Sequence, residues 1–318
     1  MNIPYNLTSR EQEQDNIQIE FFVTLSLEKN SSLVKVDIEV ENRAIEHRVR
    51  VLFRTGIESV ESIADQQFGT IRRPVYLSEV ENWRENGWNE KPRTIEPMQS
   101  FVSLANDHEN VSIITDCVRE YQITGEKFDT IALTLFRSTP EMGKAELKDR
   151  PGRASGMANW ETPDANLLKN LKFNFSISIG KNEYSISKIS NISKEYLTPF
   201  YYYQAAEFKN VDIFFLMNKP EIQDVPFDYS IFSSENRNCI LSTVKKAEKE
   251  NALIIRVYNP DDKKSTDFDI IYHYDIKNTS LVKFDEETVM DNVEFSFDGN
   301  KIKINNVKTC QALSIKVK

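Results

Sequence analysis

The sequence predicts an all-β protein: a large antiparallel β-sandwich followed by a smaller β-sandwich. The main observation is a period-two alternation of apolar and polar residues in several stretches, which is typical of strands with one buried face. Helical periodicity is weak throughout. The 318 residues are enough for two domains with buried cores, so a chain of many strands fits this architecture.

The first clear strands lie near the N-terminus. In VKVDIEVE, residues 34–41, aliphatic side chains alternate with charged ones, and in HRVRVLFR, residues 47–54, they alternate mainly with arginines. We expect the short NRAIE segment to join the two strands as a hairpin, with acidic residues opposite arginines on the outer face. We interpret this charged face as solvated rather than as a docking surface for another domain.

Similar strands recur further along the chain. LKFNFSISI predicts a strand that buries Leu171, Phe173, Phe175, Ile177 and Ile179, and VEFSFDGNKIKI predicts a hairpin around Asp298 and Gly299.

Between these strands the alternation stops at a segment with a tyrosine cluster and prolines at both ends. We therefore expect a large domain over residues 1–198, a linker over residues 199–226 and a small domain over residues 227–318.

Residues 136–167 form the longest stretch without strand alternation, and they hold three of the nine glycines and three of the eleven prolines. Loops longer than ~12 to 15 residues are usually functional or disordered. We expect this one to be ordered, because Met142, Leu147, Met157 and Trp160 are suited to packing it down.

The loop contains KDRPGRASG, in which Pro151 and Gly152 separate Arg150 from Arg153. This arrangement suits two guanidinium groups aimed at one carboxylate or diol. The alternative is that the arginines pair with acids such as Asp149 or Glu161 and pin the loop. Spacing alone favours neither.

Composition excludes several classes of function. The net charge is −9 and no basic stripe occurs, which argues against a nucleic acid partner. No run is long and apolar enough to span a membrane and no signal peptide is recognisable, so we expect a cytoplasmic protein. The three cysteines lack CxxC spacing, and we interpret them as small buried residues.

The residues offer little catalytic chemistry. His273 and Asp275 have the spacing of two metal ligands, but we assign Tyr272 and Tyr274 to the buried series of their strand, and no further histidine or cysteine lies nearby. No metal site and no hydrolytic triad are therefore expected. The three tryptophans, Trp83, Trp88 and Trp160, suit sugar stacking, with buried packing as the more ordinary use.

Four stretches together resemble the C-terminal region of family 38 glycoside hydrolases, the α-mannosidases, with mannosylglycerate hydrolase-like bacterial members most similar. They are ENRAIEHRVRVLFRTGI, QQFGTIRRP, KDRPGRASG and VKKAEKENALIIRVYNP, in the order and at about the intervals of that family. The resemblance runs from about residue 17 to the end. It implies a supersandwich of galactose-mutarotase-like type followed by a smaller sandwich.

The resemblance also implies a division of labour. Family members carry an N-terminal α/β barrel-like domain with a zinc ion, an aspartate nucleophile and a second carboxylate, and nothing here matches that domain. The chain is therefore expected to be part of a longer polypeptide, inactive alone and without a cofactor of its own, with the zinc in the catalytic domain. Its partners would be that domain and an α-mannoside at the shared active-site mouth.

The resemblance further implies that an arginine of the 148–156 loop, Arg150 or Arg153, reaches the active-site mouth. Phe68, Gly69 and Arg72 of FGTIRRP are expected to be structural residues near the catalytic-domain interface.

Two alternatives remain. One is an independent carbohydrate-binding or interaction module, motivated by the tryptophans. The other is a purely structural sandwich, whose uncovered face would favour self-association into a homo-oligomer.

Overall fold

The computed structural model describes residues 2–7, 17–143, 146–147, 149–151, 160–181, 184–202 and 229–318. The chain divides into two compact units, Met1–Ile189 and Ser190–Lys318. Most of the linker expected over residues 199–226 lies outside the described residues. Each unit has its own layers and its own core.

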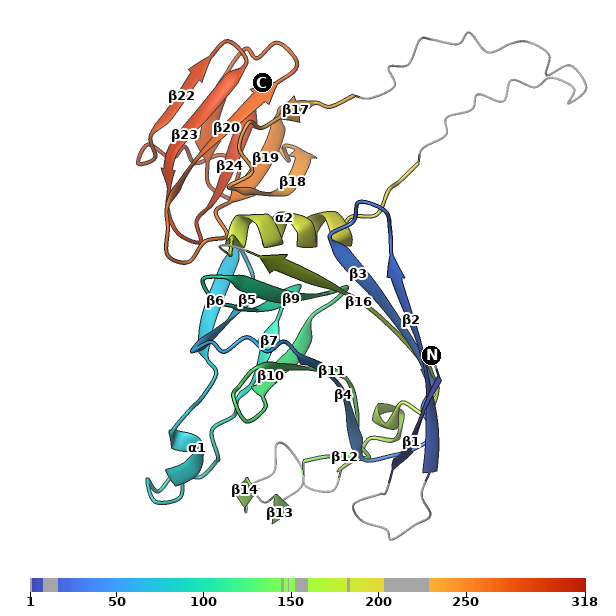
Figure 1. Cartoon of the computed structure of the whole chain (residues 1–318). Helices are drawn as coiled ribbons and strands as arrows, with labels where there is room; N and C mark the ends of the chain where they lie inside the picture. The colour runs from blue at the N-terminus through green and yellow to red at the C-terminus, as the bar shows by residue number, and fades with distance from the viewer. Residues whose placement is uncertain are drawn as a thin grey trace, which may run out of the picture. The chain divides into compact units, whose positions relative to one another are not determined.

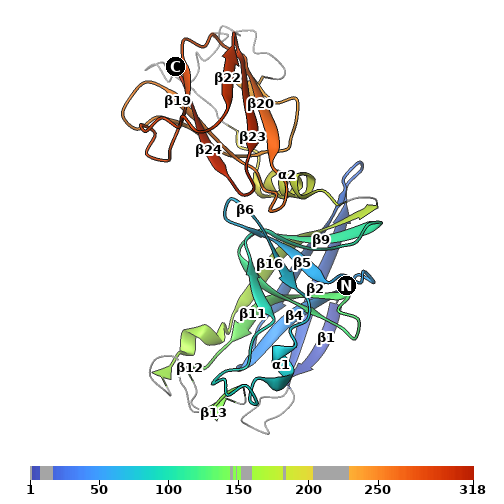
Figure 2. The ribbon, with the colours of Figure 1, turned by 90° about the vertical axis from the view of Figure 1, so that its left-hand side faces the viewer.

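The first unit is a sandwich of two antiparallel sheets (Figures 1 and 2). The larger sheet has the order β1 (Asn2–Leu7), β2 (Ile17–Leu27), β3 (Leu33–Glu41), β16 (Asn170–Lys181), β9 (Glu109–Thr115), β8 (Phe101–Ala105), β5 (Glu61–Gln66) and β6 (Gly69–Pro74). The smaller sheet has the order β4 (His47–Arg54), β11 (Thr130–Ser138), β10 (Arg119–Thr124) and β7 (Ile95–Met98). The core lies between them and includes Val36, Tyr121, Leu133 and Phe175.

The expected hairpin of β3 and β4 is wrong. β3 pairs with β2 and β16, whereas β4 pairs with β11 in the other sheet. Each of these strands carries one apolar face, and the two apolar faces can be buried against each other across a core when the strands lie in opposite sheets. Alternation alone does not distinguish this arrangement from a hairpin within one sheet. The expected ladder of acids and arginines is therefore absent from this pair, and Glu39 of β3 instead pairs with Lys172 at 2.6 Å.

The strand predicted around residues 171–179 exists as β16, with a burial that differs at its end. Phe173 and Phe175 are buried as expected, but Ile179 is 68% exposed. Ile179 is paired with Val111 of β9, which is half-buried against the core, so the edge of the core lies between these two neighbouring positions. Period-two alternation identifies the face of a strand, but not where the opposing layer stops.

Short elements complete the first unit. They are α1 (Glu79–Asn82), η1 (Pro163–Asn166), and two small antiparallel pairs: β12 (Glu141–Met142) with β15 (Trp160–Glu161), and β13 (Glu146–Leu147) with β14 (Arg150–Pro151). α2 (Ile186–Leu197) spans the boundary between the two units. Within the part of the chain described, no helix is long and apolar enough to cross a membrane.

The second unit is a sandwich of two four-stranded sheets. One has the order β17 (Phe232–Ser233), β20 (Thr266–Tyr272), β23 (Lys301–Val307) and β22 (Phe295–Asp298); the other has the order β18 (Ile240–Lys246), β19 (Leu253–Tyr258), β24 (Ala312–Val317) and β21 (Thr279–Val282). Ile255, Ile270, Ile302 and Ile315 belong to its core. These two sandwiches confirm the all-β prediction.

Two local predictions for this unit have opposite outcomes. The hairpin at Asp298 is confirmed, since β22 and β23 pair there and Gly299 adopts a φ of 59° that suits a tight turn. The buried series expected for β20 is wrong at Tyr274. The strand ends at Tyr272, and Tyr274 is 52% exposed.

The interpretation of the cysteines as buried residues holds for one of the three. Cys239 is buried, and burial raises the pKa of its thiol to about 12. Cys310 is half-buried, and Cys117 is exposed.

Candidate functional site

The segment between β6 and β7 projects from one end of the first unit and carries α1 (Figure 1). Trp83 is buried, and the guanidinium carbon of Arg84 lies 4.7 Å from the centre of its ring. Trp88 is 45% exposed. Buried packing, the more ordinary use expected of each tryptophan, thus holds for Trp83 and not for Trp88.

The base of the arginine loop is tied to this segment by three contacts. The backbone N–H of Lys91 donates to the carbonyl oxygen of Asp149 at 2.9 Å. The Asp149 carboxylate pairs with Arg93 at 2.9 Å. Arg150 Nε lies 2.9 Å from a carboxylate oxygen of Glu90. Exposed ion pairs are individually weak, but contacts that converge on two adjacent residues hold the loop base in one place.

The structure therefore describes only one of the two arginines that the sequence singled out. Arg150 is three-quarters buried and has Glu90 as its ion-pair partner, rather than the Asp149 or Glu161 that the sequence suggested. Glu90 lies far away in sequence, so only tertiary structure could reveal the pairing. Arg153 lies outside the described residues.

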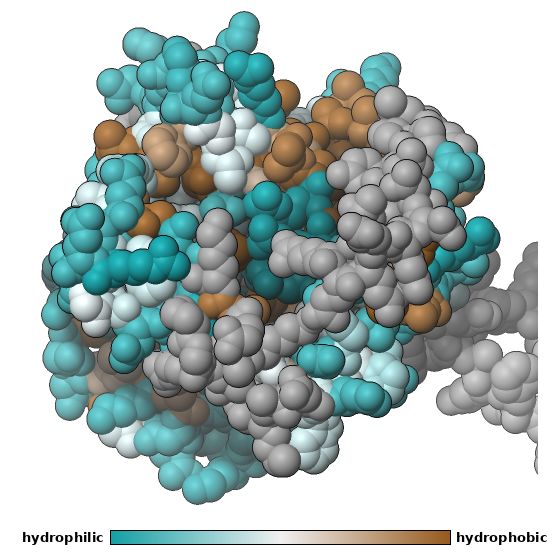
Figure 3. Space-filling view, turned by 90° about the horizontal axis from the view of Figure 1, so that it is seen from below, coloured by the Kyte–Doolittle hydropathy of each residue, from teal (hydrophilic) through white to brown (hydrophobic). Residues whose placement is uncertain are grey.

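Three of the four hydrophobic residues that were expected to pack the long loop down are instead exposed. Met142, Leu147 and Trp160 are between 38% and 55% exposed, while Met157 lies outside the described residues. Figure 3 views this end of the first unit and shows hydrophilic side chains near the centre of the view, with hydrophobic residues mainly above them. Trp88 and Trp160 are thus available for contact with another molecule or domain.

The FGTIRRP segment forms the turn between β5 and β6. Phe68 has a φ of 61° at this turn, and β6 begins at Gly69. Arg72 pairs with Glu61 of the neighbouring strand at 2.6 Å. These contacts lie within the first unit.

Arg73, which sequence reasoning did not single out, is the arginine that reaches a cavity. It pairs with Glu96 at 3.1 Å, and it donates to the carbonyl oxygen of Pro97 at 3.1 Å and to the hydroxyl of Tyr121 at 3.3 Å. The only signal in the sequence is the period of two, which places Arg72 and Arg73 on opposite faces of β6.

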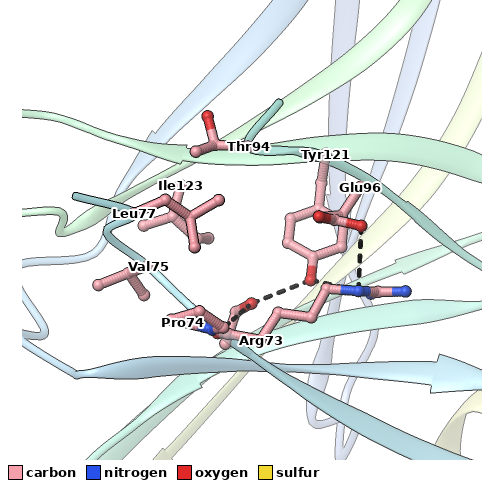
Figure 4. Close-up of a pocket in the computed structure, with 9 residues that line it drawn as sticks. Arg73, Pro74, Val75, Leu77, Thr94, Glu96, Tyr121 and Ile123 are labelled. Carbon is pink, nitrogen blue, oxygen red and sulfur yellow. Dashed lines mark hydrogen bonds and ion pairs between the residues drawn. The ribbon is translucent and has the colours of Figure 1, made fainter. Parts of the chain in front are cut away.

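The cavity has a volume of about 170 Å³ and is flanked by β6 and β7, the outer strands of the two sheets (Figure 4). Its lining residues are Ser62, Arg73, Pro74, Val75, Leu77, Thr94, Glu96, Tyr121 and Ile123. The buried Tyr121 hydroxyl lies 2.9 Å from Ser62 Oγ. Because Arg73, Glu96, Tyr121 and Ser62 bind one another, we interpret their network as a structural joint between the two sheet edges.

The described residues do not fit a zinc site. Both ring nitrogens of His273 lie about 3.0 Å from oxygens of other residues, Nδ1 from the Ser230 carbonyl and Nε2 from Ser233 Oγ. Nowhere in the described ranges do three His, Cys, Asp or Glu side chains gather in a way that could hold a metal ion.

Comparison with known proteins gives matches in both units. The model of the glycosyl hydrolases family 38 C-terminal domain matches residues 9–141, and that of the glycosyl hydrolases family 38 C-terminal beta sandwich domain matches residues 238–317. A protein of Halalkalibacterium halodurans named "Putative mannosylglycerate hydrolase" is 24% identical over 292 residues, which cover 90% of this chain and 28% of that protein.

Two solved structures from Enterococcus faecalis share the fold. One is a protein in glycosyl hydrolase family 38, with a TM-score of 0.70 and 16% identity over 97% of this chain and 31% of the other. The second is an α-mannosidase from strain V583, with a TM-score of 0.73 and 17% identity over 97% of this chain and 30% of the other. The chain thus spans less than a third of these proteins. With both of its sandwiches matched by models of one family, the chain belongs to the C-terminal region of the family 38 glycosyl hydrolases.

Proposed function

We propose that this chain is the non-catalytic β-sandwich part of a zinc-dependent, retaining α-mannosidase, and that it supports a catalytic domain of the same polypeptide. Family membership and the greater length of the relatives support this assignment. Zinc and the nucleophile would belong to the catalytic domain, the substrate would be an α-mannoside, and the enzyme would act in the cytoplasm.

The main observation in support of the proposed role of the arginine loop is that Asp149 and Arg150, at its base, are held by several contacts. The contacts of Glu90, Lys91 and Arg93 with Asp149 and Arg150 fix the point from which residues 152–156 continue. A guanidinium that is already restrained by a carboxylate loses less side-chain entropy when it meets sugar hydroxyls. We propose that Arg150 or Arg153 contacts the substrate at the active-site mouth.

The division of labour is tested by hydrolysis of an aryl α-mannoside. We expect the 318-residue chain to give no turnover, and a protein extended upstream by the region that the relatives possess to give full turnover. Equal turnover by the two proteins would contradict the proposal, because this chain would then contain its own catalytic groups.

The arginine loop is tested in the extended protein by Arg150→Ala and Arg153→Ala. Loss of one charge-assisted contact in the transition state should lower kcat/KM about tenfold or more in at least one variant, with a nearly unchanged melting temperature. Arg137→Ala, which removes an exposed partner of Glu120, is the matched control.

Glu90→Gln separates the two roles that Arg150 can play. If Arg150 serves as a structural pin, Glu90→Gln and Arg150→Ala should both lower the melting temperature and leave the kinetics normal. If Arg150 contacts substrate, Arg150→Ala should impair catalysis much more than Glu90→Gln does. Normal kinetics in both arginine variants would refute the substrate role of the loop.

The exposure of Trp88 and Trp160 favours a second candidate function, an independent carbohydrate-binding module. It predicts that the 318-residue chain binds a mannoside in calorimetric titration and that Trp88→Ala or Trp160→Ala abolishes the binding. Unchanged heats in these two variants would exclude it.

A further inference from the structure

The second unit has an open hollow of about 310 Å³ at one end of its sandwich. β18 and β24 end there, β20 ends there, and β19 begins there. Its lining residues are Lys246, Asn251, Ala252, Leu253, Tyr272, Tyr274, Asp275, Val317 and Lys318. All of them belong to the second unit, so the hollow depends on no other part of the chain.

One wall of the hollow is aromatic. The rings of Tyr272 and Tyr274 lie 5.8 Å apart, and the ring of Tyr229 lies 6.2 Å from that of Tyr274 in an edge-on arrangement. Tyr274 is 52% exposed and Tyr229 is 61% exposed. Tyr272 is half-buried and packs against the core, whereas Tyr274 and its neighbour Tyr229 keep apolar area in contact with water, beside a concave surface that a ligand could fill.

Apart from Lys318, the polar side chains that line the hollow are not engaged with other described residues. The Lys246 ammonium, the Asn251 amide and the Asp275 carboxylate make no hydrogen bond or ion pair within the described part of the chain, and neither do the hydroxyls of Tyr272 and Tyr274.

Charged residues next to the hollow behave differently. Lys245 pairs with Glu286 at 2.8 Å, Lys316 pairs with Glu250 at 2.6 Å, and Lys318 also pairs with Glu250. The hollow therefore gathers several donors and acceptors that the fold leaves unused, whereas Lys245, Lys316 and Lys318 are paired with glutamates.

We propose that this hollow binds one pyranose ring of a neutral oligosaccharide. A pyranose presents apolar C–H faces, which suit the tyrosine wall, and hydroxyls, which suit an acceptor at Asp275 and donors at Lys246 and Asn251. The unused charges, one ammonium and one carboxylate, balance each other, and Lys318 is neutralised by Glu250; this balance favours an uncharged ligand over an anionic one.

The site is distinct from the arginine loop and from the exposed tryptophans, all of which lie in the first unit. The inference therefore does not rest on the proposed function. In an enzyme that acts on glycans, such a site would hold a second part of the substrate or a neighbouring chain.

The test is calorimetric titration of the 318-residue chain with α-mannobiose, maltose and cellobiose. A small open site with one aromatic wall should give a Kd of about 1 mM for at least one of these disaccharides. We expect Tyr274→Ala and Asp275→Asn each to weaken that binding at least tenfold. Both residues are exposed, so the melting temperature should not change.

Tyr202→Ala and Asp298→Asn are matched controls, because Tyr202 is 96% exposed and neither residue lines the hollow. They should bind as the unchanged protein does. The proposal would be overturned if none of the three disaccharides bound. It would also be overturned if Tyr274→Ala and Asp275→Asn bound the disaccharide as tightly as the unchanged protein does. Loss of binding only in Trp88→Ala or Trp160→Ala would also overturn it, because the sugar would then lie in the first unit.

Discussion

At the scale of single residues, His47 shows how burial acts on one side chain. It lies at the start of β4 with its ring edge-on to Phe136, the ring centroids being 5.4 Å apart. Burial lowers the pKa of His47, and a backbone contact with Ile45 offsets only part of this effect. The folded state therefore favours the neutral imidazole.

This lowered pKa predicts that the first unit loses stability in mild acid. The unfolded chain binds a proton near the usual pKa of about 6.5, whereas the folded state resists it; stability is thus fully present above that pH and declines below it. Tryptophan fluorescence reports this unit alone, because all three tryptophans lie in it. Thermal melts between pH 7.5 and 5.5 should show the decline.

His47→Gln should flatten this pH dependence, and His108→Gln, which changes an exposed histidine, should leave it as it is. An equally steep decline in His47→Gln would show that another group is responsible.

At the scale of elements, two buried asparagines form hydrogen bonds that hold together segments between strands. Asn42, after β3, donates to the carbonyl oxygens of Asn166 and Leu167 and accepts from the Ala44 N–H. Asn259, after β19, donates to the carbonyl oxygens of Lys264, Val307 and Lys308, and accepts from the Asp261 N–H. Each belongs to a stretch that carries the family resemblance.

Asn42→Ala is expected to destabilise the first unit by about 2 kcal/mol, because it removes several buried hydrogen bonds, among them the one to the Asn166 carbonyl oxygen. Urea unfolding followed by tryptophan fluorescence measures this change. Arg43→Ala, next in sequence and in an exposed ion pair with Glu41, should change stability by less than about 0.5 kcal/mol. A similar small effect of Asn42→Ala would contradict the fastening role.

At the scale of the whole molecule, the two units have separate cores, one that includes Leu133 and Phe175 and another that includes Ile255 and Ile302. Domains with separate cores can unfold separately. We expect two transitions in calorimetry, of which only one coincides with the change in tryptophan fluorescence. Asn42→Ala should lower that transition, and Asn259→Ala should lower the other. A single transition that both variants shift equally would show that the units unfold together.

The sequence by itself determined the fold class and the local hairpin at Asp298, because alternation and turn chemistry are written in neighbouring residues. It also located several of the strands and, through four motifs, pointed to the family. Tertiary structure alone decided which strands pair: β3 and β4 lie in different sheets although their patterns also suit a hairpin.

Tertiary structure also decided which side chains meet. The pairing of Arg150 with Glu90, the contact of Arg73 with Tyr121 and the exposure of Tyr274 depend on where chain segments distant in sequence come together or end. Periodicity indicates on which face of a strand a side chain lies, but it does not indicate which other segment packs against that face. For this reason the sequence indicated the arginine loop, while the hollow lined by Tyr272 and Tyr274 emerged only from the folded chain.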